Sequence, residues 1–450
     1  MVKNAWTANP ARINKSTNPD IDFSRQFVLP KETLPFRRAR ELDAYVWEKP
    51  IEAHAERSHV ICGGRDMLML GGYSYLGLLT NQHVKDKFCE VAAKLGTGSC
   101  GVAALSGTSV YHKNVESLIS NIWNREQTIL YPSGYTANLA VINAITRAGD
   151  EIYIDTYAHM SLHDACSQSK AKRVLFDHQD LAGLDMKLSK SRSNKNKLVV
   201  VDAVYSMDGN ICSLIEVVAI CKKHKALLLV DECHAFGMLQ PYGFGIEEYY
   251  NLPTGTIDLR IGTLSKAIPS AGGFVSCSNE LADYIRHHGH HNIFSGSQSA
   301  ANMAAAETAI NLLLDNPEWI CALHKKANDF RSYANELGLH TGTSETAIIP
   351  IIIDDVDQCI LTAAKLFEQG IYIQPVLFPA VKKSRLRVGI SVNMSNVELR
   401  AAAKKISDVV NSTEVCRLRK TGTSDAFEEK HGGRAPSCRK SHAETDLSVR

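Results

Sequence analysis

The chain has 450 residues, more than one small hydrophobic core can organise, so two or three domains are expected. With 44% hydrophobic and 22% charged residues and a formal net charge of +2, it has the composition of a globular enzyme and no basic face for nucleic acid. The absence of a signal-peptide segment, of an apolar run near the ~20 residues of a membrane span and of any Cys-x-x-Cys pair predicts a cytoplasmic protein without a membrane span.

The first 290 residues are expected to form an N-terminal arm with a helix (1–60) and a large domain (61–290). Within the large domain, short apolar runs alternate with helical patterns, which is typical of βαβ units and a largely parallel sheet. The expected strands lie at 128–131, 151–154, 173–176, 198–201, 227–230 and 257–261.

The remaining residues are expected to form a smaller α+β C-terminal domain (291–412) and a disordered tail (413–450) that has no apolar periodicity. Helices are predicted over 300–337 and 360–369, and strands at 347–353, 371–376 and 386–390. The predicted fold class is therefore α/β, with a large, mostly parallel-sheet domain followed by the smaller one.

Residues 96–101, Gly-Thr-Gly-Ser-Cys-Gly, have the G-x-G-x-x-G spacing of a dinucleotide-binding turn. A helical pattern rather than a strand precedes them, and no helix begins at their end, so a nicotinamide site is not expected. A glycine-rich loop that closes over a substrate fits this context better.

Two strand ends carry residues suited to a phosphorylated aromatic ligand. Ser133-Gly134-Tyr135 follows an apolar run and opens a helical pattern, so the backbone N–H groups and the Ser133 hydroxyl form a phosphate cradle, although many strand-to-helix turns have this composition. His159 follows the strand predicted at 151–154 and is suited to stack on an aromatic ring. Taken alone, it is better interpreted as an ordinary loop histidine whose hydrogen bonds are satisfied.

An acid and an amine follow two further strands. Asp231 ends the apolar run 226–230, at the edge where open α/β sheets bind ligands, although an aspartate there also caps helices. Lys266 lies just past another apolar stretch among small residues, with the Thr263 hydroxyl three residues before it, and the alternative is a surface lysine. Pyridoxal phosphate (PLP) needs both groups, because an amine forms its Schiff base and an acid holds its pyridinium nitrogen protonated. His234, three residues after Asp231, is placed to bond the phenolic oxygen.

In this order the motifs resemble those of the α-oxoamine synthases, a branch of the fold-type-I PLP-dependent transferases, from about Tyr73 to Val409. The resemblance is carried by Ser74-Tyr75-Leu76-Gly77-Leu78, Gly98-Ser99-Cys100-Gly101 with Ser106-Gly107-Thr108, Ser133-Gly134-Tyr135, His159, Val204-Tyr205-Ser206-Met207-Asp208-Gly209, Asp231-Glu232-Cys233-His234, Thr263 with Lys266, and Arg387.

The resemblance implies a role for each matching residue. It implies phosphate contacts from Ser133, Gly134, Tyr135 and Thr263, ring stacking by His159, contacts near the phenolic oxygen from Ser206 and His234, the pyridinium partner in Asp231 and the Schiff-base amine in Lys266. On the substrate side it implies Arg387 for the amino-acid carboxylate, Tyr75 and Ser106 in substrate-contacting motifs, and Ser295 of the partner subunit at the phosphate of a homodimer. His159, Asp231 and Lys266 are the implied catalytic residues, and no metal is implied.

The implied reaction is a decarboxylative Claisen-type condensation of a small amino acid with an acyl thioester, either acyl-CoA or an acyl-carrier protein. It gives an α-amino ketone, carbon dioxide and a free thiol. Ala103 stands where several members carry an arginine, which favours an uncharged alkyl chain over a succinyl or pimeloyl donor. Two alternatives stay open, namely another fold-type-I reaction (an aminotransferase or a C–C lyase) and a non-catalytic partner subunit. The choice among glycine, alanine and serine also stays open.

Overall fold

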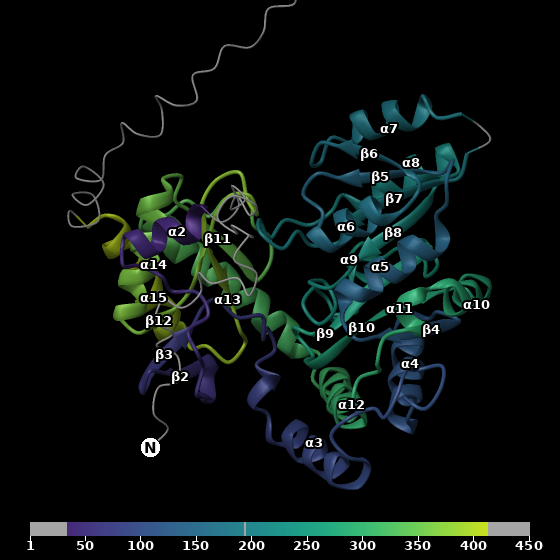
Figure 1. Ribbon diagram of the computed structural model, residues 1–450. Helices are drawn as coiled ribbons and strands as arrows, with labels where there is room; N and C mark the ends of the chain where they lie inside the picture. Colours follow the sequence, from purple (N-terminus) through teal and green to yellow (C-terminus); the bar gives the residue numbers. More distant parts are fainter. Residues whose placement is uncertain (1–33, 193–194, 413–450) are drawn as a thin grey trace, which may run out of the picture.

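The computed structural model describes residues 34–192 and 195–412, so the arm predicted before residue 34 and the tail predicted from 413 lie outside the described residues. Two lobes are visible in Figure 1, a large one around a long sheet and a smaller one built from both ends of the described chain. The large sheet has the order β4-β10-β9-β8-β7-β5-β6. Its strands are β4 (Gln127–Tyr131), β5 (Glu151–Asp155), β6 (Lys172–Phe176), β7 (Lys197–Asp202), β8 (Leu227–Asp231), β9 (Leu259–Ser265) and β10 (Pro269–Cys277).

Alternate side chains of the parallel strands pack on opposite faces of this sheet. In β7, Leu198 and Val200 join the core beneath α5, α6 and α10, whereas Val199 and Val201 join the core beneath α4, α7 and α8. Strands covered on both faces read as continuous apolar runs, which is why the sequence pattern locates them. The helices of this lobe are α3 (Gln82–Leu95), α4 (Val110–Trp123), α5 (Gly134–Ile145), α6 (Met160–Gln168), α7 (Leu181–Ser189), α8 (Leu214–His224), α9 (Ile246–Tyr249), α10 (Asn279–His288), α11 (His290–Ile293) and α12 (Ala300–Asp315).

Strand β10 is absent from the sequence prediction and pairs antiparallel with both β4 and β9. Its Pro-Ser-Ala-Gly-Gly start hides the strand pattern. Gly273 is required there by close approach, because a Cβ atom would lie 2.4 Å from the backbone nitrogen of Gly134 and the carbonyl of Ser133. Gly272 has φ +143°, a conformation that favours glycine. The glycines therefore let β10 pass directly beneath the start of α5.

The small lobe contains two further sheets. The order β11-β14-β13 joins β11 (Ile348–Ile352), β14 (Arg385–Gly389) and β13 (Pro375–Val376), and the order β1-β2-β3-β12 joins β1 (Ala53–His54), β2 (His59–Cys62), β3 (Arg65–Met69) and β12 (Ile371–Tyr372). The single strand predicted at 371–376 is thus two short strands in different sheets. The helices are α2 (Leu34–Glu41), α13 (Glu318–Glu336), α14 (Val356–Glu368) and α15 (Asn396–Val410). A short 3₁₀ turn, η3 (Glu56–Ser58), lies between β1 and β2, and another, η4 (Leu78–Thr80), lies between β3 and α3.

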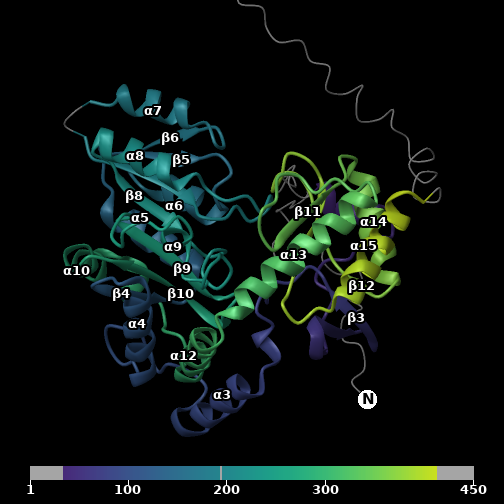
Figure 2. The same cartoon turned by 180° about the vertical axis from the view of Figure 1, so that it is seen from behind.

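The lobes of the structure do not coincide with the predicted domains, whose boundaries were placed at residues 61 and 291. Segments on each side of these boundaries belong to the other lobe. Strands β2 and β3 pair with each other and, through β3, with β12, so they belong to the small lobe. Helix α12 packs against α3, α4 and β10 of the large lobe, and α13 reaches from the junction into the small lobe (Figure 1, Figure 2). In the described part of the chain, no helix is both long and apolar enough to cross a membrane.

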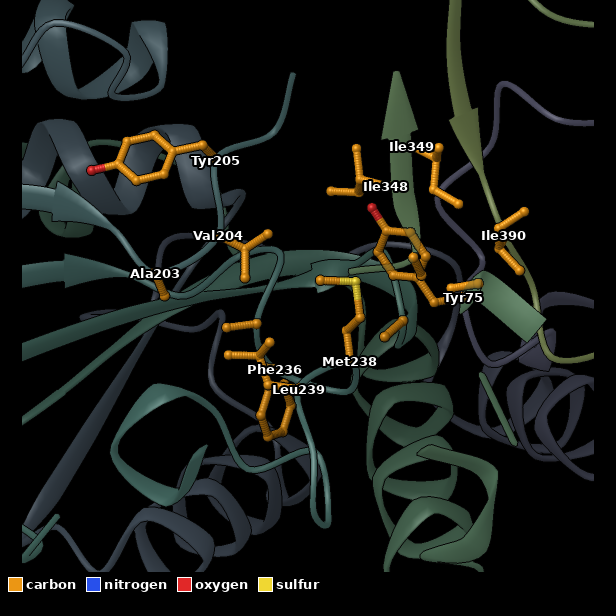
Figure 3. Close-up of a cluster of buried hydrophobic side chains, with 14 of the residues drawn as sticks. Tyr75, Ala203, Val204, Tyr205, Phe236, Met238, Leu239, Ile348, Ile349 and Ile390 are labelled. Carbon is orange, nitrogen blue, oxygen red and sulfur yellow. The ribbon is translucent and has the colours of Figure 1, made fainter. Parts of the chain in front are cut away.

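A single hydrophobic core runs through the junction of the lobes. Figure 3 shows Tyr75 beside Ile348 and Ile349 of β11, with Met238 and Phe236 from the segment after β8 below them. This continuous packing fixes the segment around Tyr75 against the carboxyl ends of the large sheet.

Candidate active site

Aspartates end three neighbouring parallel strands of the large sheet. Asp231 ends β8, Asp202 ends β7 directly beside it in the register, and Asp155 ends β5, the next strand along. All three are buried. The carboxyl ends of parallel strands are the usual ligand edge of such sheets, so this edge is the candidate site.

The Asp231 carboxylate is oriented by two donors. Its Oδ2 accepts a hydrogen bond from Asn138 Nδ2 at 2.7 Å, and its Oδ1 accepts one from the backbone nitrogen of Cys233 at 2.8 Å. The side chain is 5% exposed. Donors of this kind offset the cost of burying a carboxylate, and each oxygen keeps a second lone pair for a ligand N–H.

Asp202 holds the backbone of the next site residue. Both of its oxygens lie 3.2 Å from the backbone nitrogen of His159, which donates to them. Burial, and then the adjacent Asp231 charge, raises the pKa of Asp202 well above its usual range. Asp202 therefore keeps a proton to higher pH than an ordinary aspartate does.

The His159 imidazole has a defined tautomer. His159 caps α6, and its Nδ1 accepts from the backbone nitrogen of Ser161 at 3.3 Å and contacts the Ser161 hydroxyl at 2.7 Å. Because Nδ1 accepts a backbone N–H, the ring proton lies on Nε2. The side chain retains solvent exposure, yet crowding by protein atoms lowers the pKa of the imidazole through desolvation, so the ring is neutral near pH 7.

Lys266 directly follows β9 and lines a cavity of about 700 Å³ between the lobes. The positive charge of Lys266 shifts the pKa values of the surrounding groups. Burial, and then the Lys266 charge, lowers the pKa of His234 well below its usual range, and the same charge acts on His159 and Asp202. The amine, the strand-end carboxylates and both histidines therefore share one electrostatic neighbourhood.

The start of α5 meets the middle of β9. Ser133 is the N-cap, and its Oγ accepts from the backbone nitrogen of Thr136 at 3.1 Å. A Cβ atom on Gly134 would lie 2.9 Å from Cys233 Sγ and 3.4 Å from Thr263 Cβ, so these residues touch. The Thr263 hydroxyl lies 2.9 Å from the Gly272 carbonyl oxygen. The helix N–H groups and two hydroxyls converge here, as an anion cradle requires.

Tyr135 contributes only its backbone to this cradle. Its ring is exposed, and its hydroxyl donates to Asp164 rather than toward Thr263. The predicted cofactor contact of Tyr135 is therefore one that only its backbone N–H group, and not its side chain, can make.

A second network joins Tyr75, His234 and Arg387. The Tyr75 hydroxyl lies 2.8 Å from His234 Nδ1 and accepts from Arg387 Nη2 at 3.2 Å. In the tautomer that carries the His234 proton on Nε2, the hydroxyl donates its own proton to Nδ1 while it accepts from arginine. Burial raises the pKa of Tyr75 to about 12, so the phenol keeps that proton. Tyr75 thus acts on Arg387 and His234 instead of facing the Lys266 cavity.

Arg387 is held without a carboxylate partner. Its Nε donates to the Ser206 carbonyl oxygen at 2.6 Å, and its guanidinium stacks 4.6 Å from the Tyr73 ring centre. Among the described residues Nη1 has no hydrogen-bond partner, so it is free to bind an anion. Ser206 therefore acts through its carbonyl, and no hydrogen bond of its hydroxyl occurs within the same part of the chain.

Ser106 and Ser295 lie apart from this cluster. The Ser106 hydroxyl donates to the Cys100 carbonyl oxygen at 3.1 Å, and Gly296 pairs with Val102, so the glycine-rich loop and the segment around Ser295 pack on each other. No contact joins either serine to Lys266, Asp231 or His159 within residues 34–192 and 195–412. This chain alone does not bring the two serines to the site.

Two residues of the cluster were missed by the sequence reasoning. Asp202 ends the apolar run 198–201 just as Asp231 ends its own run, so the same pattern was available to find it. Asn138 lies five residues past Ser133 inside a helix, and only its contacts with Ser161 and Asp231 mark it. No cluster of metal-binding side chains occurs in the described ranges.

The residues present fit PLP. An amine, a strand-end carboxylate and an anion cradle surround one edge of the sheet. The approach of Gly273 to Gly134 leaves the cradle's N–H groups uncovered by side chains. In such a site Lys266 would hold the aldehyde carbon, Asp231 the ring nitrogen, and Ser133, Gly134 and Thr263 the phosphate.

Comparisons with known proteins agree with this assignment of the fold. Residues 65–406 match the family model described as aminotransferase class I and II. The 8-amino-7-oxononanoate synthase of Lysinibacillus sphaericus is 35% identical over 354 residues, which cover 78% of this chain and 91% of that protein. The serine palmitoyltransferase of Sphingobacterium spiritivorum is 31% identical over 82% of this chain and 93% of its own length.

Solved structures give the same result. The serine palmitoyltransferase of Sphingomonas wittichii superposes with a TM-score of 0.82 at 28% identity, covering 88% of this chain and all of that one. A serine palmitoyltransferase solved with a PLP internal aldimine gives the same TM-score at 29% identity. The architecture is that of the fold-type-I PLP-dependent transferases. The chain belongs to the aminotransferase class I and II family, and within it to the α-oxoamine synthases.

Proposed function

We propose that this protein condenses a small amino acid with an acyl thioester and releases carbon dioxide, a free thiol and an α-amino ketone, with PLP as cofactor. The observation that carries the proposal is the placement of Lys266, Asp231 and the Ser133–Thr263 cradle around one strand edge. Relatives named 8-amino-7-oxononanoate synthase and serine palmitoyltransferase support it.

Bound PLP supplies an electron sink for the charge left when a proton is removed beside the amino group. Asp231 would accept the ring N–H, which keeps that sink effective. His159, neutral and fixed by Ser161, would cover the ring face, and its tautomer directs Nε2–H away from Ser161. His234 presents its own Nε2–H, because Tyr75 occupies Nδ1.

Arg387 and Lys266 act on the amino acid. Arg387 Nη1 binds the carboxylate, and the bonds to Ser206 and Tyr75 fix the plane of the guanidinium before substrate arrives. With PLP bound, the Lys266 amine would be the base that takes the proton from the α-carbon of the amino acid. Preorganised charges at this edge lower the barrier without rearranging water.

The cavity beside Lys266 favours an uncharged acyl chain. Tyr73, Leu79, Ile390 and Met394 are among its apolar lining residues, and among the described residues Lys266 is its only lysine or arginine. Of its two histidines, His59 lies 2.8 Å from Asp66 and 3.3 Å from Glu398, and burial lowers the pKa of His54. A carboxylate at the end of the acyl chain would therefore find no lysine or arginine among the described lining residues besides Lys266, and burying a charge without a partner of opposite charge is costly.

A homodimer in the cytoplasm is part of the proposal. Leu105 and Phe294 are 85% and 79% exposed on the two segments that the Val102–Gly296 bridge brings together. Large exposed apolar side chains beside Ser106 and Ser295 suit a contact with a second subunit. In such a dimer, the two serines of one subunit would complete the site of the other. The acyl donor is acyl-CoA or an acyl-carrier protein.

We expect PLP-loaded protein to release carbon dioxide from carboxyl-labelled amino acid only when a thioester is added. Because the described lining of the cavity offers a terminal carboxylate no lysine or arginine besides Lys266, kcat/KM is expected to be about 10-fold or more higher for octanoyl-CoA than for pimeloyl-CoA. Leu79→Arg, which adds a cation to the cavity wall, is expected to narrow this ratio. Leu79→Met is the matched control.

The two parts of this proposal fail separately. Carbon dioxide release without any thioester would contradict the condensation and favour another fold-type-I reaction. A preference for pimeloyl-CoA, with release still dependent on thioester, would contradict only the uncharged acyl chain.

A further inference from the structure

The buried side-chain amide of Asn138 links Asp231, which would hold the ring nitrogen of the cofactor, to His159, which would cover the ring face. Asn138, the fifth residue of α5, is 1% exposed, and its Nδ2 donates to Asp231 Oδ2 at 2.7 Å and to Ser161 Oγ at 2.9 Å. The Ser161 hydroxyl lies 2.7 Å from His159 Nδ1. A continuous path of hydrogen bonds therefore runs from Asp231 through Asn138 and Ser161 to the His159 ring.

The directions of these bonds are fixed by chemistry. The Asn138 NH₂ group has two hydrogens, and one goes to each oxygen partner. Since Ser161 Oγ accepts one of them, its own proton is donated to His159 Nδ1, which leaves the imidazole proton on Nε2. A side chain with no donor, or with one, cannot satisfy both partners at this position.

The opposite end of the amide is left without a partner. Asn138 Oδ1 is buried, and no hydrogen bond to it is found among the described residues. An unpaired buried carbonyl is costly, so stability of the helix does not explain an asparagine here. The asparagine contributes an NH₂ group at this position, and both hydrogens of that group are donated to residues of the site.

We propose that Asn138 is a positioning residue for PLP, which sets the orientation and charge of Asp231 and the tautomer of His159 at the same time. The inference rests on the proposed cofactor site but goes beyond the residues that touch the cofactor. Loss of the NH₂ group removes a donor from the charged form of Asp231, and donors to a carboxylate favour that form. It also frees the Ser161 hydroxyl to rotate away from His159.

The test is PLP binding to the full-length protein, without substrates, for Asn138→Leu and Asn138→Asp. Leucine keeps the approximate volume and removes both donors, whereas aspartate keeps the shape and places an acceptor against Asp231. We expect the PLP dissociation constant to rise about 10- to 100-fold in Asn138→Leu, as for other residues that orient ligand-holding groups, and further in Asn138→Asp. The pH below which PLP binding is lost is expected to move upward in Asn138→Leu.

Asn143→Leu is the matched control, because Asn143 lies in the same helix and its Nδ2 donates only to the Leu139 carbonyl oxygen at 2.9 Å. It is expected to bind PLP as the parent does, with the same pH dependence. Circular dichroism identifies any variant that has failed to fold, and Asn138→Ser, which keeps one donor, is expected to bind PLP with intermediate affinity.

The outcomes separate this inference from the proposed function. If Asn138→Leu is folded and binds PLP with the parent's affinity and pH dependence, Asn138 has no positioning role. If the parent itself binds no PLP, the proposed function fails, and the positioning role falls with it.

Discussion

Lys266→Ala is expected to lower kcat by about 10³-fold or more while leaving the fold intact. The residue lies at the end of β9 and lines the cavity between the lobes, so removing its side chain opens space in a site without uncovering the core. The variant loses both the covalent link to PLP and the base that removes the α-proton. Turnover with amino acid and acyl thioester measures the effect, and circular dichroism with thermal unfolding checks the fold.

Lys223→Ala is the control for this variant. Lys223 pairs with Asp185 on the surface at 2.8 Å, with 61% of its side chain exposed, and should keep the parent's activity. A Lys266→Ala protein with full activity would show that the amine has no part in the chemistry, and the assignment of the site would be wrong.

Arg260→Met is expected to destabilise the protein by about 3–5 kcal/mol. Arg260 is 2% exposed in the core behind the site, where its Nε donates to Glu232 at 2.5 Å and its Nη1 donates to Glu247 at 3.1 Å. The guanidinium also stacks 3.9 Å from the ring of Trp123. Methionine keeps much of the packing but leaves the buried Glu232 carboxylate without its cation, and leaves Glu247 with only Arg125, at 3.4 Å. Equilibrium urea unfolding measures the change in free energy.

Two further variants identify the cause of that loss. Arg260→Met combined with Glu232→Gln and Glu247→Gln removes all three charges and keeps the side-chain oxygens that accept from the backbone nitrogens of Ile246 and Ile257. It is expected to recover part of the lost stability. Arg173→Met, at an exposed arginine, is expected to change stability by less than about 0.5 kcal/mol. A loss below about 1 kcal/mol in Arg260→Met would mean that the carboxylates find other partners or take up protons at little cost.

The central parallel strands β5, β7, β8 and β9 were predictable because burial on both faces leaves an apolar run in each. Strand β10 was not, since the glycines that let it pass beneath α5 remove the apolar signal. Strands β1 to β3 are short and join the small lobe through the pairing of β3 with β12, which lies about 300 residues later in the chain, so no local pattern assigns them to that lobe.

Part of the candidate site could likewise be predicted from the sequence, and part could not. Asp231, His159 and Lys266 stand at strand ends, where position along the chain alone indicates a ligand edge. The links among them are long-range contacts: Tyr75 and Arg387 are 312 residues apart, and Asn138 and Asp231 are 93 apart. Side-chain orientation decides such contacts, and the sequence pattern contains no measure of it. Ser106 and Ser295 stay predictions that depend on a second subunit.

The visible absorption spectrum of the PLP-loaded protein tests the central claim most directly. Glycine, alanine and serine are added in turn, and an acyl thioester is added last. The account predicts a cofactor band that shifts with one of the three amino acids, changes again with the thioester, and is accompanied by release of free thiol. A protein that takes up no PLP, or whose cofactor band responds to none of the three amino acids, would contradict it.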